Sequence, residues 1–100
     1  MMATTLDYRN FVLDQLRLVD GITCKAMMGE YLLYKDGILF GGIYDNRLLL
    51  KITPTNAQFK MPQAIPYKNA KPMYAFAEID DEKLLKKVVL ATCDGLKCKK

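Results

Sequence analysis

Two tight-turn signals within the stretch 25–52 most constrain how this chain can fold. Asp36-Gly37 and Asp45-Asn46 are each flanked by apolar and aromatic runs of strand length. Glycine and aspartate accept the positive φ angles that two-residue hairpin turns require, so Asp-Gly is among the strongest short hairpin signals. The stretch therefore predicts three antiparallel strands joined by two turns.

Two-residue turns also determine which side chains share a face of the sheet. Residue 34 would then lie opposite 39, 32 opposite 41, 43 opposite 48, and 41 opposite 50. One face would be almost wholly apolar, which predicts the core, and would carry Leu32, Tyr34, Leu39, Gly41, Ile43, Leu48, Leu50 and Ile52. The other would be mixed and would carry Tyr31, Leu33, Lys35, Ile38, Phe40, Gly42, Tyr44, Arg47, Leu49 and Lys51. A type I turn with a β-bulge at residues 35–37 would instead shift part of this register and exchange the faces.

The chain of 100 residues, 51% of them hydrophobic, predicts one domain over residues 1–100. No apolar run is long enough to cross a membrane, and the N-terminus lacks the pattern of a signal peptide, which favours the cytoplasm. The formal net charge is +4, but Lys97, Lys99 and Lys100 supply most of it, so residues 97–100 form a basic tail on a nearly neutral body. Three charges alone give weak, salt-sensitive affinity for nucleic acid.

Residue types that are missing exclude several kinds of site. The sequence contains no histidine, serine or tryptophan, which rules out a Ser-His-Asp triad and a histidine-ligated metal. General acid–base chemistry would require paired carboxylates, and nothing in the sequence shows that Glu30, Asp36 and Glu78 meet. We therefore expect a protein that is not an enzyme and holds no cofactor or metal.

The flanking segments predict helices at both ends of the chain. An apolar stripe with helical spacing covers 6–19, with Thr4 or Thr5 as its cap and Gly21 as its stop. Segment 53–59 predicts a short helical turn, 60–72 a surface connection, and 73–79 a further strand. A second long helix would begin at Asp80 or Asp81 and end at Gly95.

This order of elements predicts an α+β fold with two layers. An antiparallel sheet, made of the three-stranded meander and at least one further strand, would be covered on one face by the N- and C-terminal helices. Ile22 to Met28 would lead into the sheet.

The cysteines and glycines leave alternatives open. Cys24, Cys93 and Cys98 could offer thiolates to zinc or form a disulfide, but their spacing matches neither a metal knuckle nor a redox motif. The alternative is that they have no functional role, with Cys93 buried. Gly41-Gly42 could admit a ligand or another backbone close to the strand, or could mark a bulge or a place where a helix packs tightly on the sheet.

The mixed sheet face is the candidate interaction surface. Its aromatic and basic side chains are Tyr31, Lys35, Phe40, Tyr44, Arg47 and Lys51. Such a mixture suits a protein partner or a second copy of the chain, because tyrosine, phenylalanine and arginine are enriched in interfaces. Aromatics that stack on bases and cations that meet phosphates also suit nucleic acid. A third alternative is that the chain's own loops cover this face.

The stretch 25–51, KAMMGEYLLYKDGILFGGIYDNRLLLK, resembles the N-terminal domain of the TfoX/Sxy competence regulators. That family typically has R-x-M-F-G-G-Y-G-L-Y-x-x-G-x-x-F, a short strand, and then L-Y-L-K. The matching positions are Met27, Gly29, Tyr31, Leu33, Tyr34, Gly37, Phe40, Leu48, Leu50 and Lys51. Met28 replaces the family's phenylalanine, and Glu30 and Leu32 replace two of its glycines.

The resemblance implies an α+β fold, a bacterial cytoplasmic setting and a role in transcriptional regulation of competence. It supplies no catalytic residues. The chain is similar to short, standalone members that lack the second, C-terminal domain of the full-length regulators. We therefore expect an interaction or regulatory module, with direct weak binding of nucleic acid as the alternative.

Overall fold

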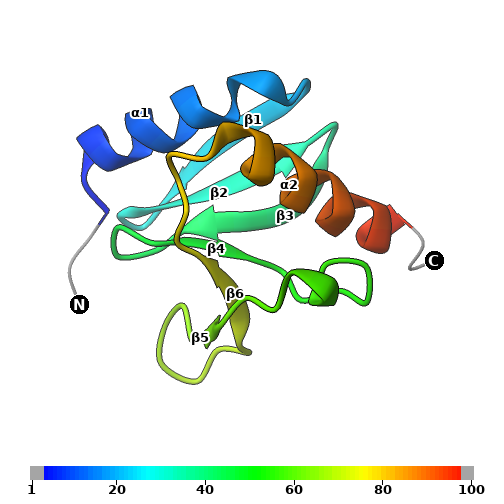
Figure 1. The fold of residues 1–100 in the computed structure, drawn as a ribbon. Helices are drawn as coiled ribbons and strands as arrows, with labels where there is room; N and C mark the ends of the chain where they lie inside the picture. Colours follow the sequence, from blue (N-terminus) through cyan, green and yellow to red (C-terminus); the bar gives the residue numbers. More distant parts are fainter. Residues whose placement is uncertain (1–3, 98–100) are drawn as a thin grey trace.

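The computed structural model describes residues 4–97, which form an antiparallel sheet with two helices on one of its faces (Figure 1). The elements follow in the order α1 (Leu6–Gln15), η1 (Leu16–Leu18), β1 (Ile22–Met27), β2 (Glu30–Lys35), β3 (Ile38–Ile43), β4 (Leu48–Leu50), η2 (Ala57–Phe59), β5 (Gln63–Ala64), β6 (Met73–Phe76) and α2 (Glu82–Lys97). The predicted two-layer α+β fold is confirmed.

The sheet has six strands in the order β1-β2-β3-β4-β6-β5, and every neighbouring pair is antiparallel. Strands β1 and β5 were not predicted from the sequence, because segment 22–28 was expected only to lead into the sheet and segment 60–72 only to form a surface connection. A third two-residue turn joins β1 to β2, with positive φ at Met28 (48°) and Gly29 (86°). Methionine rarely adopts this conformation, so Met-Gly is not a recognisable hairpin signal.

Both predicted turns are confirmed as two-residue turns. Asp36 and Gly37 have φ of 51° and 81°, and Asp45 and Asn46 have φ of 52° and 55°. Positive φ at both central residues is typical of the type I′ turn, whose twist matches that of the strands it joins. The expected pairs 34–39, 43–48 and 41–50 all form.

The expected pairing of residue 32 with 41 is wrong, because a β-bulge between β2 and β3 inserts Phe40 as an extra residue. Tyr34 pairs with Leu39, but Leu33 pairs with Gly41 and Leu32 with Gly42. The pairing therefore shifts by one residue within the strands, although the turn itself is regular. Because side chains alternate with period two, this shift changes which residues of β2 and β3 share a face.

The helix-covered face of the sheet differs from the predicted core face for this reason. Ile43, Leu48 and Leu50 lie in the core as expected, whereas Leu32, Leu39 and Ile52 line the opposite face, which we call the outer face. The core beneath the helices comprises Val12, Leu16, Val19, Leu33, Phe40, Ile43, Leu48, Leu50, Phe76, Ile79, Leu85, Val88, Val89 and Cys93.

Helix α1 begins where the sequence predicted. Thr5 is its N-cap, and the Thr5 side chain accepts a hydrogen bond from the Tyr8 amide. The helix ends earlier than the expected Val19, because α1 stops at Gln15 and continues as the 3₁₀ turn η1. The buried Gln15 amide Nε2 donates to the Ile79 carbonyl at 3.0 Å, which joins α1 to the segment preceding α2.

Helix α2 does not end at Gly95 as predicted, since it runs to Lys97 with Gly95 buried inside it. A Cβ at Gly95 would lie 2.4 Å from Thr55 Oγ1 and 2.6 Å from Thr53 Cβ. The glycine therefore makes room for the loop that precedes η2. The fully buried Asn56 holds this loop against α2, because its Nδ2 donates a hydrogen bond to Thr92 Oγ1 of the helix at 2.8 Å.

Candidate functional site

The six residues of the predicted interaction face do not lie together. Tyr31, Lys35 and Phe40 belong to the helix-covered side of the sheet, and Tyr44, Arg47 and Lys51 belong to the outer side. The prediction of a single mixed face is therefore wrong, because the strand pairing shifts by one residue at the Phe40 bulge.

The three residues on the helix side have contacts within the chain. Phe40 has no exposed area and lies in the core. Tyr31 is half-buried, with the Arg9 guanidinium 5.3 Å from the centre of its ring, a cation–π contact. Lys35 Nζ lies 2.9 Å from Asp36 Oδ2, and this hydrogen bond raises the pKa of Lys35.

Two of the three residues on the outer side, Tyr44 and Arg47, contact the connection between β5 and β6. The Tyr44 ring is nearly buried and lies 6.2 Å from the ring of Tyr67, measured between centroids. Burial is the main cause that raises the pKa of Tyr44. Arg47 donates to the carbonyls of Tyr44 and Ile65 at 3.3 and 3.4 Å, so its guanidinium holds this connection against the sheet.

The paired glycines serve close packing. A Cβ at Gly41 would lie 2.3 Å from the Leu49 carbonyl oxygen, and one at Gly42 would lie 2.6 Å from the Tyr31 carbonyl oxygen and 2.8 Å from the Tyr44 ring. The structure therefore shows the expected bulge beside Gly41 and a close approach of neighbouring strands and the Tyr44 ring, rather than of a helix.

An open groove crosses the outer face, and we call it the outer groove. It has a volume of about 580 Å³. Its lining residues are Met27, Leu32, Leu39, Gly41, Tyr44, Lys51, Ile52, Pro66, Tyr67, Ala70, Lys71, Pro72 and Met73. Of these lining residues, Tyr44 and Lys51 were predicted as site residues from the sequence, whereas Tyr67, Lys71 and Met73 were not. Residues 67 and 71 fall in segment 60–72, which was predicted only as a surface connection. The pair Pro66-Tyr67 was the signal that could have indicated a site there.

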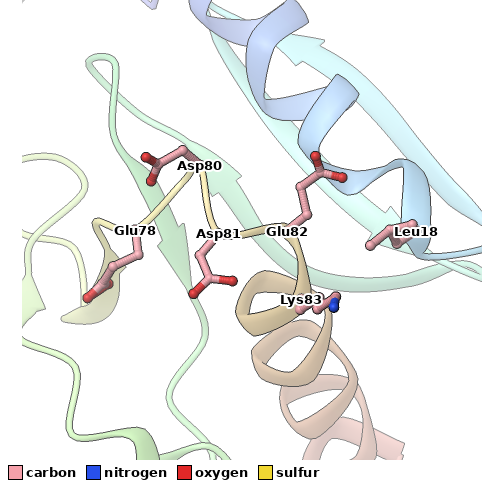
Figure 2. Close-up of a pocket in the computed structure, with 6 residues that line it drawn as sticks. All are labelled: Leu18, Glu78, Asp80, Asp81, Glu82 and Lys83. Carbon is pink, nitrogen blue, oxygen red and sulfur yellow. The ribbon is translucent and has the colours of Figure 1, made fainter.

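The acidic residues do not form a catalytic pair. Glu30 is buried beside the N-terminal segment, whereas Asp36 lies in an exposed turn. Glu78 lines a shallow depression of about 620 Å³ together with Leu18, Asp80, Asp81, Glu82 and Lys83. Figure 2 shows the carboxylates of this depression diverging from one another. Asp81 Oδ1 accepts the Leu84 amide at 3.1 Å, and Glu82 pairs with Arg17 at 2.8 Å, so these two stabilise the start of α2.

The cysteines in the described part of the chain lie apart from metal-binding partners. Cys93 is buried and Cys24 is half-buried, and burial raises the pKa of both thiols. Within residues 4–97 no group of three or more potential ligands (histidine, cysteine or acidic side chains) is placed to hold a metal ion. Cys98, Lys99 and Lys100, which belong to the expected thiolate set and basic tail, fall outside the described residues.

Most residues of the matched sequence motif lie in turns or in the core, where they support the fold. Gly29 and Gly37 occupy turns at positive φ, and Leu33, Phe40, Leu48 and Leu50 lie in the core. Met27, Tyr31, Tyr34 and Lys51 retain exposed area, and Met27 and Lys51 line the outer groove.

Comparison with known proteins agrees with this fold and motif. The model of the TfoX N-terminal domain family matches residues 14–93. A protein of Spirochaeta aurantia, described as an uncharacterised 12.7 kDa protein in the trpE 5′ region, is 36% identical over 83 residues. The match covers 81% of this chain and 72% of that protein. No helix within residues 4–97 has the length and apolar character needed to cross a membrane.

Proposed function

Because this chain belongs to the TfoX N-terminal domain family, we propose that it is a non-enzymatic interaction module with a regulatory role in the bacterial cytoplasm. Its first partner would be a second copy of the chain. The observation that carries the proposal is the open outer edge of β1. The chain's resemblance to the N-terminal domain of competence regulators supports transcriptional regulation as the process in which such a dimer would act.

Strand β1 presents a row of backbone groups to solvent. The Asp36 amide donates to the Gly21 carbonyl at 3.0 Å, and the two-residue turn after Met27 sets the same alternation along the strand. Residues 21, 23, 25 and 27 therefore bond to β2, and the N–H and C=O groups of Ile22, Cys24 and Ala26 point away from the sheet. Among residues 4–97 no strand pairs with this edge.

Charge and the outward-facing backbone groups together favour one way of pairing two β1 edges. In an antiparallel pair centred on Cys24, Ile22 lies opposite Ala26 of the second copy, and Thr23 lies opposite Lys25. A pair centred on Lys25 would instead place two ammonium groups directly opposite each other, which is unfavourable. The Cys24-centred pair uses all three outward-facing residues. It would join the two sheets through main-chain hydrogen bonds, as in β-strand addition.

Sedimentation velocity over a concentration series tests this assembly. Thr23 and Lys25 are exposed in the monomer, so substitution there leaves the core intact. Thr23→Lys should weaken dimerisation by about three- to tenfold, because each of two symmetric pairs gains a like charge, and Thr23→Glu should strengthen it. A wild-type chain that remains monomeric up to about 1 mM would refute the proposal, as would equal effects of the two variants.

Covalent trapping tests the register. Directly opposed, hydrogen-bonded residues of an antiparallel pair have Cα atoms about 5.5 Å apart, which lies within disulfide range. In a Cys98→Ser background, mild oxidation should therefore yield a dimer crosslinked through Cys24, and Cys24→Ser should abolish it. A dimer in sedimentation that Cys24 fails to crosslink would exclude this register.

The alternative function is weak binding of nucleic acid by the outer face. The observation in its favour is the presence of Tyr44, Tyr67, Lys51 and Lys71 along the same groove. Fluorescence anisotropy with labelled duplex and single-stranded DNA at low and physiological salt tests it, comparing the intact chain with one truncated after Leu96. Binding that survives physiological salt and truncation would support this alternative. Binding that is lost with the tail would assign the affinity to the tail lysines.

A further inference from the structure

The outer groove lies between the sheet and the β5–β6 connection. Its floor is the outer surface of the central strands, and residues 66–73 provide a wall. Two hydrogen bonds shape this wall. Arg47 Nη2 donates to the Ile65 carbonyl at 3.4 Å, and the Ala70 amide donates to the Tyr67 carbonyl at 3.0 Å. The volume of about 580 Å³ is in the usual range of small-molecule sites.

The floor of the groove is apolar and partly open to solvent. Leu32, Leu39 and Met73 are half-buried, and Met27 and Ile52 are 40% and 36% exposed. Tyr67 contributes an aromatic ring that is 49% exposed. Covering this surface with the apolar part of a ligand would therefore be favourable.

Lysine is the one charged residue type among the lining residues. Lys51 comes from the segment after β4, Lys71 comes from the β5–β6 connection, and no carboxylate lines the groove. Within residues 4–97 neither lysine forms an ion pair, although Arg17 and Lys35 do. The complement of this surface is an apolar molecule with a negatively charged end.

We propose that the outer groove binds a small amphipathic carboxylate of the fatty-acid class. The hydrocarbon lies on the floor formed by Leu32, Leu39 and Ile52, and Lys51 and Lys71 attract the carboxylate. The site goes beyond the dimerisation proposed above, because it uses side chains of the outer face and none of the backbone edge of β1. Ligand occupancy of this groove would give the module a small-molecule input.

Isothermal titration calorimetry with decanoate below its micellar concentration tests the site. We expect saturable binding with one ligand per chain. Lys51→Gln and Lys71→Gln should each weaken it by about threefold, and the double variant by roughly tenfold, because both charges are accessible to solvent. The matched control is Lys86→Gln with Lys87→Gln, which removes two exposed charges from α2 and should leave the affinity unchanged.

A neutral ligand separates the charge effect from the apolar effect. Decanol should bind the wild-type chain more weakly than decanoate, and the two lysine substitutions in the groove should remove this difference. Backbone amide shifts in NMR should change at Leu39, Ile52 and Met73. Absence of saturable binding, or equal decanoate affinity of the groove variant and the α2 control, would overturn the proposal.

Two further arms identify the source of the negative charge. The same variants are titrated with phosphatidylglycerol vesicles and with single-stranded oligothymidylate. Binding of either that depends on Lys51 and Lys71, in the absence of decanoate binding, would overturn the small carboxylate in favour of a lipid surface or nucleic acid. Failure of dimerisation in sedimentation leaves these titrations interpretable, because they report on the groove alone.

Discussion

Glu30 joins the N-terminal segment to two hairpin turns. Its Oε1 accepts the Thr4 hydroxyl at 2.6 Å, the Thr4 amide at 3.2 Å and the Asp45 amide at 3.1 Å. Glu30 is 7% exposed, so little water reaches these donors to accept their hydrogen bonds in place of the carboxylate. The TfoX pattern has glycine at this position, and in this chain the carboxylate adds a connection that glycine cannot make.

We expect Glu30→Ala to lower the free energy of unfolding by about 1–3 kcal/mol, because it leaves buried donors unpaired. Glu30→Gln keeps an acceptor oxygen and should cost less. Urea denaturation followed by circular dichroism measures both. An alanine variant as stable as the wild type would show that water replaces the carboxylate.

Gly95 tests steric packing against helix propensity. In an isolated helix, Gly95→Ala would be favourable by about 1 kcal/mol. Here the added methyl meets Thr53 and Thr55, so we expect net destabilisation of about 1–3 kcal/mol in urea denaturation. Asp94→Ala, at the exposed neighbouring position, is the control and should change stability by less than about 0.5 kcal/mol. A stabilised Gly95→Ala variant would mean that the loop moves aside easily.

At the scale of elements, the bulge in β3 decides which aromatic residues form the core. Phe40 is the inserted residue, and it is fully buried beneath the helices. From the sequence it was expected on the candidate interaction surface, where its substitution would affect binding. The structure indicates that its first effect is on folding.

We expect Phe40→Ala to destabilise the domain by about 3–5 kcal/mol, because it leaves a large cavity in the core. Tyr67→Ala removes a partly exposed ring from the outer groove and should cost far less. Thermal denaturation of both variants distinguishes a core residue from a surface residue. Similar melting temperatures for the two would contradict this assignment of faces.

At the scale of the whole molecule, every ionisable group with a shifted pKa makes the native state less stable at alkaline pH. Burial raises the pKa of Tyr8, Cys24, Tyr44 and Cys93, so their deprotonation opposes folding. Lys35 also has a raised pKa, through its hydrogen bond with Asp36, and loses this stabilisation when it deprotonates. In each case the unfolded chain releases its proton at lower pH than the folded chain.

We therefore expect the melting temperature to fall as pH rises above the ordinary thiol value of 9.0 and phenol value of 10.0. Between about pH 6 and 8 it should be nearly constant, because the sequence has no histidine to titrate there. Calorimetry across this range measures both parts. A steep change near neutral pH would show that another group governs stability.

The sequence by itself determined the local structure of this protein. Thr5 caps α1, and the Asp-Gly and Asp-Asn pairs form turns, because capping and positive φ depend on a few adjacent residues. The periodic apolar stripes placed both helices, so the α+β class was predictable from pattern alone. The resemblance carried by residues 25–51 also gave the family.

Only the tertiary structure decided which side chains share a surface. Phe40 enters the bulge because the core beneath α1 and α2 accommodates its ring, a contact between segments distant in sequence. The same holds for Gly95, which is a predicted helix stop in the sequence but lies inside α2 against Thr53 and Thr55. The outer groove brings Lys51, which follows β4, close to Lys71, which belongs to the β5–β6 connection. Register and long-range packing depend on the whole fold, and no local pattern specifies them.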